Sequence, residues 1–197
     1  MYHKILRDAS FYSTLFQIDM DIAGATRASG CPCGGRLHSA RYPRKPRGGP
    51  GDLGPEHDRR LSFCCAVDGC RQRATPPSVR FLGRRVYFGV VVLLLTVLCH
   101  GVTARRAAAL RNELGVGRRT LERWRGWWCG AFVASAFWRS VRGRFAPGLA
   151  VGALPGSLLE RFGRAATLSA AVVAMLRFLS PLTTSWSEKG SGTTPGH

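Results

Sequence analysis

The stretch SFCCAVDGCRQR, residues 62–73, decides the fold of the first half of the chain. It contains three of the seven cysteines, and two of these are adjacent. Ser62 and Cys64 alternate with Phe63 and Cys65, which predicts a short strand whose successive side chains point to opposite faces. Only one of the two adjacent thiols can therefore point at a shared site, and the four-residue spacing to the next cysteine favours Cys65.

A second pair of cysteines lies upstream in CPCGG, residues 31–35, on a turn of proline and glycine. Cys65 and Cys70 flank a second turn dipeptide, Asp68-Gly69. Two turns that each carry two thiolates can face each other and complete the tetrahedral four-sulfur site of a zinc ribbon. The C-x4-C pair fits the usual ligand spacing, whereas C-x-C is tighter than usual. We predict a structural Zn²⁺ held by Cys31, Cys33, Cys65 and Cys70.

Other uses of the cysteines remain open at this point. His38 could replace one cysteine as a ligand, or the thiols could be unpaired core residues. A catalytic thiol needs a base, and the sequence positions neither His38 nor His57 for that role. The cysteine count is odd and no export signal is apparent, so a disulfide framework is disfavoured and we expect a cytoplasmic protein.

The charge balance indicates a polyanionic partner. The formal net charge is +18, from 29 basic and 11 acidic residues, and nearly all of the positive charge is arginine. A field of this size attracts nucleic acid or an anionic membrane surface. Arginine binds phosphate through two parallel hydrogen bonds and stacks on bases, which favours nucleic acid over the membrane.

The longest apolar run, VYFGVVVLLLTVLC, covers residues 86–99. A membrane span needs about 20 predominantly apolar residues, and this run reaches that length only if His100, Gly101 and Thr103 are included. We expect a buried core helix. The alternative is a small basic membrane protein with one span near residues 86–104 and a cytosolic zinc ribbon.

The stretch ARRAAALRNELGVGRRTLERWRGWW, residues 104–128, has the organisation of a helix-turn-helix. The apolar seam expected to lock the two helices together consists of Leu110, Leu114, Val116, Leu121, Trp124 and Trp128. The opposite face of the second helix presents the candidate DNA-binding residues Arg118, Arg119, Thr120, Arg123 and Arg125. The N-terminal end of such a recognition helix reaches base edges in the major groove, where arginine pairs with guanine.

Two other interpretations of this stretch have to be weighed. It could be a solvated basic helix within an ordinary helical bundle. Alternatively, the tryptophans of RWRGWW, residues 123–128, could stack on single-stranded bases. At this spacing tryptophans are more often core residues, and the basic charge balance supports binding of double-stranded DNA.

The order CPCGGRLH, RYPRK, CCAVDGCRQRATPPSVRFLGRRVY and GVGRRTLERWRGWW resembles small bacterial zinc-ribbon and helix-turn-helix proteins of mobile elements. It is similar to the N-terminal DNA-binding part of insertion-sequence transposases and their accessory proteins. The resemblance covers residues 29–130, and its C-x-C departs from the commoner C-x2-C. It implies a purely structural zinc on the same four cysteines, a recognition helix over residues 118–123, and binding to the element's DNA ends or promoter.

The acidic residues argue against a transposase within this chain. Strand transfer by the two-metal route needs several carboxylates that converge on Mg²⁺. Beyond residue 70 the acids are Glu113, Glu122, Glu160 and Glu188, and two of these lie on the proposed DNA-binding helices. We therefore expect no enzymatic activity and no small-molecule substrate. Double-stranded DNA is the expected partner, and a transposase, a recombinase or a second copy of the chain are further candidates.

The expected fold class is mostly α with a small β zinc ribbon, in which an N-terminal zinc ribbon precedes a helical helix-turn-helix domain. A helix is expected over residues 11–28, and the Pro/Gly-rich segment 41–58 is expected to be a loop or a disordered insert. The expected divisions are an N-terminal helix or arm (1–28), the ribbon with its basic insert (29–80), the helix-turn-helix domain (81–145), a C-terminal helical segment (146–180) and a disordered tail (181–197).

Overall fold

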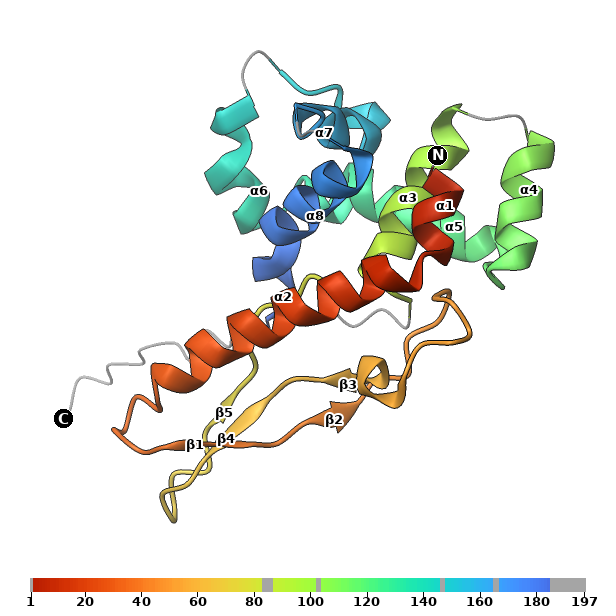
Figure 1. Ribbon diagram of the computed structural model, residues 1–197. Helices are drawn as coiled ribbons and strands as arrows, with labels where there is room; N and C mark the ends of the chain where they lie inside the picture. The colour runs from red at the N-terminus through yellow and green to blue at the C-terminus, as the bar shows by residue number, and fades with distance from the viewer. Residues whose placement is uncertain (1, 83–86, 102–103, 146–147, 165–166, 185–197) are drawn as a thin grey trace.

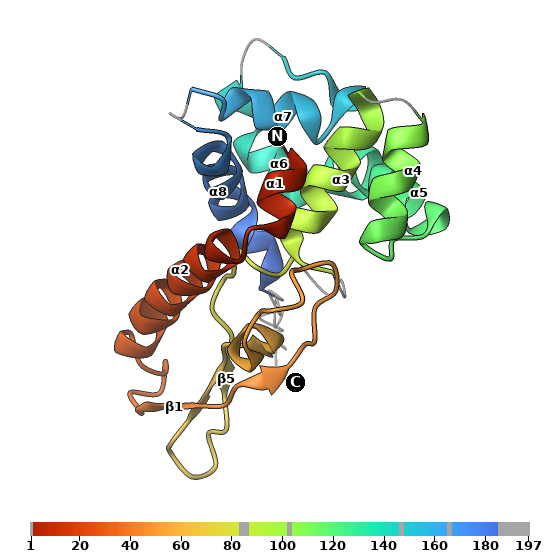
Figure 2. The same ribbon diagram turned by 45° about the vertical axis from the view of Figure 1, so that its right-hand side comes forward.

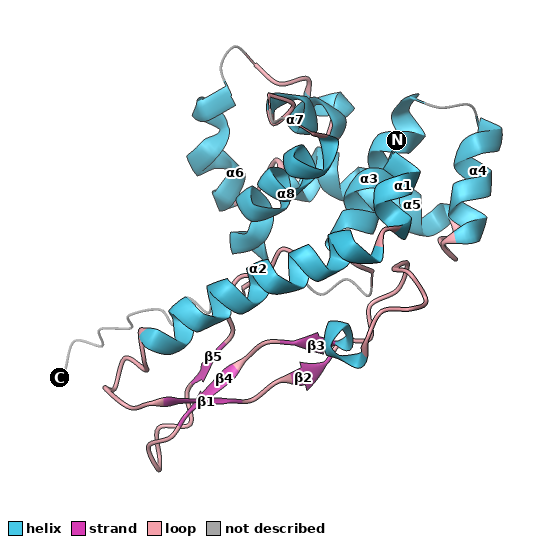
Figure 3. Ribbon diagram, viewed as in Figure 1, coloured by secondary structure: helices cyan, strands magenta, loops and turns pink. Residues whose placement is uncertain are grey.

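The computed structural model describes residues 2–82, 87–101, 104–145, 148–164 and 167–184. Most of this chain is helical, and a small antiparallel sheet lies at one end of the molecule (Figure 1). Colouring by secondary structure separates a body of packed helices from a slender strand-and-loop region (Figure 3). The expected mostly α class with a small sheet is therefore confirmed.

Two N-terminal helices, α1 (Tyr2–Arg7) and α2 (Ala9–Ala28), join these two regions. Asp8 caps α2 by accepting a hydrogen bond from the Ser10 backbone N–H, and its bonds to Ser10 lower the pKa of the Asp8 carboxyl. The first half of α2 buries Phe11, Tyr12 and Leu15 among the helices. Its second half buries Ala23 against the sheet region, so α2 runs along both (Figure 2). The helix expected over residues 11–28 is confirmed.

The sheet region is built from five very short strands. They are β1 (Leu37–Ser39), β2 (Tyr42–Pro43), β3 (Arg59–Arg60), β4 (Phe63–Cys65) and β5 (Arg73–Ala74). The order β1-β4-β5 forms one antiparallel sheet, and β2 pairs with β3 in a second. Leu37 lies opposite Cys65, and His38 lies opposite Cys64. Because side chains alternate along a strand, Leu37 and Cys65 share the buried face while Cys64 turns away from it.

The Pro/Gly-rich segment 41–58 is an ordered loop rather than a disordered insert. It contains β2 and a 3₁₀ turn, η1 (Pro55–Asp58), and the Arg47 carbonyl accepts a 3.2 Å hydrogen bond from the Phe88 N–H. A Cβ on Gly48 would lie 2.9 Å from a methyl of Val91, and one on Gly49 would lie 2.7 Å from the Phe88 ring. The glycines thus allow this loop to approach the next helix closely.

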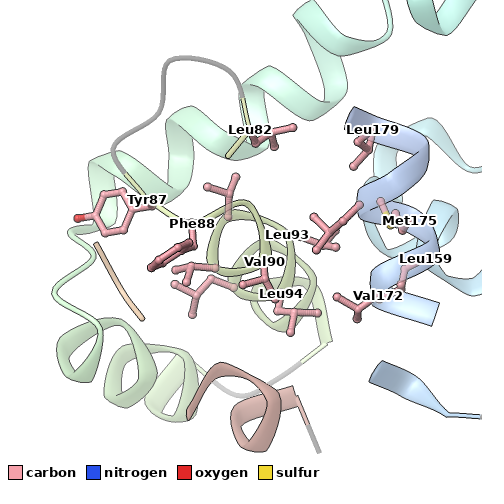
Figure 4. Packing of buried hydrophobic residues seen from close by; sticks show 14 of the residues in the cluster. Leu82, Tyr87, Phe88, Val90, Leu93, Leu94, Leu159, Val172, Met175 and Leu179 are labelled. Carbon is pink, nitrogen blue, oxygen red and sulfur yellow. The ribbon is translucent and has the colours of Figure 1, made fainter. Parts of the chain in front are cut away.

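The apolar run forms α3 (Gly89–Gly101), a helix of thirteen residues at the centre of the helical body. Residues 90–95 are fully buried. Leu93 and Leu94 face Val172 and Met175 of the C-terminal helix (Figure 4). This confirms the expected core helix. Within the described residues, no helix has both the length and the apolar character that a membrane crossing requires.

The remaining helices surround α3. They are α4 (Ala104–Glu113), α5 (Arg118–Trp127), a π-helical turn η2 (Trp128–Phe132), α6 (Ala136–Val141), the 3₁₀ turns η3 (Arg142–Phe145) and η4 (Val151–Ala153), α7 (Gly156–Arg161), α8 (Leu168–Leu179) and the 3₁₀ turn η5 (Ser180–Thr183). The helical path is interrupted after η2. The Ser135 side chain then caps the start of α6 by accepting a hydrogen bond from the Trp138 backbone N–H. The helical path that begins at Arg118 therefore ends at Phe132, the last residue of η2.

A buried ion pair fastens the sheet region to the helical body. Arg80 Nε donates to Asp19 Oδ2 of α2 at 2.8 Å, and both side chains are essentially inaccessible to solvent. The other guanidinium nitrogens of Arg80 donate to the carbonyls of His57 and Arg59, at 3.1 and 3.0 Å. Ser78 Oγ donates to the same carboxylate. The charges are thus paired and hydrogen-bonded, the condition under which a buried ion pair is tolerated.

Candidate metal centre and nucleic-acid interface

Two tight turns place the cysteines of the candidate metal centre. In the first, the Cys31 N–H donates to the Gly35 carbonyl at 2.9 Å, and the Gly34 N–H donates to the Cys31 carbonyl at 2.8 Å. In the second, the Cys70 N–H donates to the Val67 carbonyl at 3.2 Å. Gly34 adopts the left-handed conformation that such turns require and that glycine adopts without strain. Each turn thereby brings two thiols close together.

The four thiols converge on one point between these turns. The Sγ atoms of Cys31, Cys33, Cys65 and Cys70 all lie within 4.8 Å of one another. Cys31 Sγ lies 3.8 Å from Cys70 Sγ, and Cys33 Sγ lies 3.5 Å from Cys65 Sγ. Cys31 and Cys65 are buried and Cys33 is exposed, so the cluster has one side toward solvent. These four cysteines can hold a metal ion, and the prediction that they come together is confirmed.

The alternative ligands do not belong to this cluster. Cys64 points away from it, and its Sγ lies 3.9 Å from the carbonyl of Arg71. His38 lies opposite Cys64 on the neighbouring strand and is exposed. Strand alternation thus separates Cys64 from Cys65 as expected, and Cys65 is the thiol in the cluster.

The thiols of the cluster differ in their tendency to ionise. The Gly35 backbone N–H, together with hydrogen bonds from the other thiols, lowers the pKa of Cys33 to about 7. The Val67 backbone N–H favours the Cys65 thiolate, but burial and contacts with the neighbouring thiols outweigh it and raise the pKa of Cys65 to about 12. A cation must therefore displace protons from the buried thiols, so its affinity rises with pH.

Gly35 was not singled out by the sequence, yet it shapes the cluster. A Cβ at this position would lie 2.6 Å from a Val67 methyl and 2.7 Å from Cys65 Sγ. Only glycine allows the first turn to approach the second this closely. The signal was present in the sequence as the second glycine of CPCGG, but its role depends on which segment packs against it.

Helices α4 and α5 occupy the position of the expected helix-turn-helix. Gly115, in the left-handed conformation, lies in the turn between them, and its carbonyl accepts a 3.0 Å hydrogen bond from the Tyr87 hydroxyl. The Tyr87 ring also contacts Trp124 edge-on, with ring centroids 5.2 Å apart. The seam residues Val116, Leu121, Trp124 and Trp128 are buried, Leu114 is half-buried, and the Leu110 side chain lies outside the described part of the structure.

The candidate DNA-binding residues lie on the opposite face of α5. Arg118, Arg119, Arg123 and Arg125 are exposed, and Thr120 is half-buried. Arg118 Nε donates to Glu122 Oε1 at 2.8 Å in an i,i+4 pair, so part of its charge is already neutralised. An Arg123 guanidinium nitrogen lies 3.4 Å from Thr120 Oγ1. Arg119 and Arg125 contact no side-chain acceptor within the described residues, and the partner of Arg123 is an uncharged hydroxyl. These three arginines therefore keep their full charge available to a polyanion.

Comparison with known proteins gives no relative. No protein-family model, no curated protein and no solved structure matches the chain. The resemblance to mobile-element proteins thus rests on the residues of the sequence itself.

Proposed function

We propose that this chain is a non-enzymatic DNA-binding protein of a mobile genetic element, with a transposition or regulatory role. A structural Zn²⁺ would stabilise the sheet region as a zinc ribbon, and α4 and α5 would read double-stranded DNA as a helix-turn-helix. The observation that carries the proposal is the two-sided character of α5, with buried Leu121 and Trp124 on one face and exposed arginines on the other.

The geometry of the thiol cluster supports zinc as the metal. Tetrahedral coordination with Zn–S bonds of about 2.3 Å separates neighbouring sulfurs by roughly 3.8 Å. The separations of 3.8 Å for Cys31–Cys70 and 3.5 Å for Cys33–Cys65 are close to this value. Four thiolates also leave no ligand position open for water, which is the arrangement of a structural rather than a catalytic site.

The arginines support DNA as the partner. Arg119 and Arg123 are exposed on the first turns of α5, the part of a recognition helix that approaches base edges. The +18 net charge would draw the protein to the phosphate backbone before specific contacts form. Trp124 and Trp128 are buried in the core, which disfavours their use as stacking platforms for single-stranded bases.

The carboxylates support a binding role without chemistry. Glu113 forms an ion pair with Arg7 of α1, and Glu122 forms one with Arg118. Both acids of the proposed DNA-binding helices are thus engaged with arginines of the protein itself. We expect the purified protein neither to cleave nor to join DNA when Mg²⁺ is supplied.

The test is fluorescence anisotropy with duplex DNA, starting from the ends and promoter of the element that carries the gene. Arg119→Ala combined with Arg123→Ala should weaken binding by roughly thirtyfold or more, since each good arginine–base contact is worth about 1–3 kcal/mol. The matched control removes two exposed arginines elsewhere, Arg139→Ala and Arg177→Ala. Equal binding by the α5 variant and the parent would refute the placement of the interface.

A further inference from the structure

An open groove lies between the C-terminal half of α2 and the first cysteine turn with the strand that follows it, next to the thiol cluster. Its larger part is a cavity of about 680 Å³, lined by Gly24 and Arg27 of α2, by Gly34 and Gly35 of the first cysteine turn, and by Arg36 and His38. A smaller cavity continues from it along α2, shares Gly24 and Arg27, and adds Arg41. We call the two together the basic groove.

The lining of the basic groove is cationic. Arg27, Arg36 and Arg41 are exposed, and no side-chain acceptor contacts their guanidinium groups within the described residues. No aspartate or glutamate is among the described residues that line the two cavities. Arg27 lines both cavities, Arg36 lines the larger one and Arg41 the smaller one, so the groove carries positive charge along its length that an external anion can neutralise.

The floor of the basic groove carries no side chain at Gly24. Gly24 lies inside α2, where glycine costs roughly 1 kcal/mol relative to alanine. Nothing lies within 4 Å of the position that a Cβ on Gly24 would take, so packing does not require a glycine there. The absent side chain instead leaves the hollow open, and a ligand can approach the backbone of both α2 and the cysteine turn.

We propose that the basic groove binds phosphate groups of the DNA backbone, as a second contact surface beside that of α5. This inference rests on the proposed function and extends it. Phosphate contacts from a separate surface fix the orientation of a protein on the duplex without reading sequence. Because Gly34 and Gly35 belong to the turn that carries Cys31 and Cys33, metal binding shapes one wall of the groove. Loss of the metal therefore removes these phosphate contacts.

The experiment measures the affinity of the full chain for duplex DNA over a range of salt concentrations. One variant removes two cations, Arg27→Ala with Arg36→Ala, and another places a carboxylate on the groove floor, Gly24→Glu. The control, Ala25→Glu, adds the same charge to an exposed position of the same helix that does not line the groove. Circular dichroism and metal content confirm that each variant is folded.

We expect the two groove variants to bind on the order of tenfold more weakly, equally for specific and unrelated duplexes. The double arginine variant should also lower the slope of log affinity against log salt by about 0.9 per lost phosphate contact. The Ala25→Glu control should stay within about twofold of the parent, and chelator should reduce the slope of the parent as the arginine variant does.

Groove variants with the affinity and slope of a DNA-binding parent would overturn the groove and leave the proposed function intact. Weaker binding with an unchanged slope would also overturn it, because no phosphate contact would have been lost. A parent that binds no duplex at low salt would overturn both proposals.

Discussion

The sheet region and the helical body of this protein are held together by different means. The sheet region has a small core, consisting of Ala23, Cys31, Leu37, Leu61, Phe63 and Cys65, and two of these are thiols of the cluster. The helical body has an extended apolar core centred on α3, in which residues 90–95 are fully buried (Figure 4). A region with few apolar residues needs another source of stability, and a metal ion held by the four cysteines would supply it. The comparison predicts that a destabilising substitution in one region unfolds that region before it affects the other.

The largest effect should follow Cys65→Ser. A structural Zn²⁺ site contributes roughly 10–16 kcal/mol of apparent binding free energy, and removal of a buried ligand forfeits much of it. We expect residues 29–80 to lose their structure and the protein to lose bound metal, as measured by metal analysis and amide exchange. Cys64→Ser is the matched control and should retain metal, because that thiol faces away from the cluster. The reverse outcome would show that the register of this strand is shifted by one residue.

Asp19→Asn should have the next largest effect, because it breaks the pair that joins the two regions. Arg80 would stay buried with its charge uncompensated, at a cost of about 3–5 kcal/mol in the free energy of unfolding. Denaturant unfolding measures this loss. Asp21→Asn is the control on the same helix, where the carboxylate is exposed and accepts a hydrogen bond from Gln17. Similar unfolding midpoints for the two variants would contradict the role of the buried pair.

Leu94→Ala tests the other side of the comparison. The side chain is fully buried in α3, and its truncation should cost about 2–5 kcal/mol in unfolding free energy. The folded variant should still bind one equivalent of metal, because the cluster lies outside this core. Val151→Ala, at a position that is 39% exposed, should be nearly neutral. Metal loss from folded Leu94→Ala protein would mean that the two regions are not separately stabilised.

The smallest effect should come from a single methyl group at Gly35. In Gly35→Ala the new Cβ would contact Val67 and Cys65 Sγ at less than 3 Å, so the two turns must separate. We expect metal affinity to fall by about tenfold, equivalent to roughly 1.4 kcal/mol, in a competition titration with a chromogenic chelator. Gly24→Ala is the control, because its Cβ meets open space and alanine favours the helix by up to about 1 kcal/mol. Unchanged affinity in Gly35→Ala would show that the turns can yield at no cost.

Sequence patterns predicted those features that depend on neighbours along the chain. The spacing of Cys65 and Cys70, the alternation around Cys64 and the apolar run of α3 each indicated the correct local structure. The ion pair between Arg118 and Glu122 could also have been predicted from the sequence, because the two residues have the i,i+4 spacing of neighbours on a helix face.

Features that depend on distant contacts could not be predicted in this way. Asp19 and Arg80 are far apart in sequence, and nothing local identifies them as partners. The prolines and glycines of segment 41–58 predicted a loop or a disordered insert without deciding between them, and the close packing of Gly48 and Gly49 on Val91 and Phe88 shows an ordered loop. The basic groove brings Arg27 of a helix next to Arg36 of a loop, a pairing that only the fold creates.

Amide hydrogen exchange of the full protein, with and without a zinc chelator, tests the central contrast most directly. We predict that chelation removes protection from residues 31–39 and 59–74, which surround the cluster, while residues 89–98 of α3 and 168–179 of α8 remain protected. Loss of protection throughout the chain, or no loss in either region, would contradict a metal-held ribbon attached to an independently stabilised helical body.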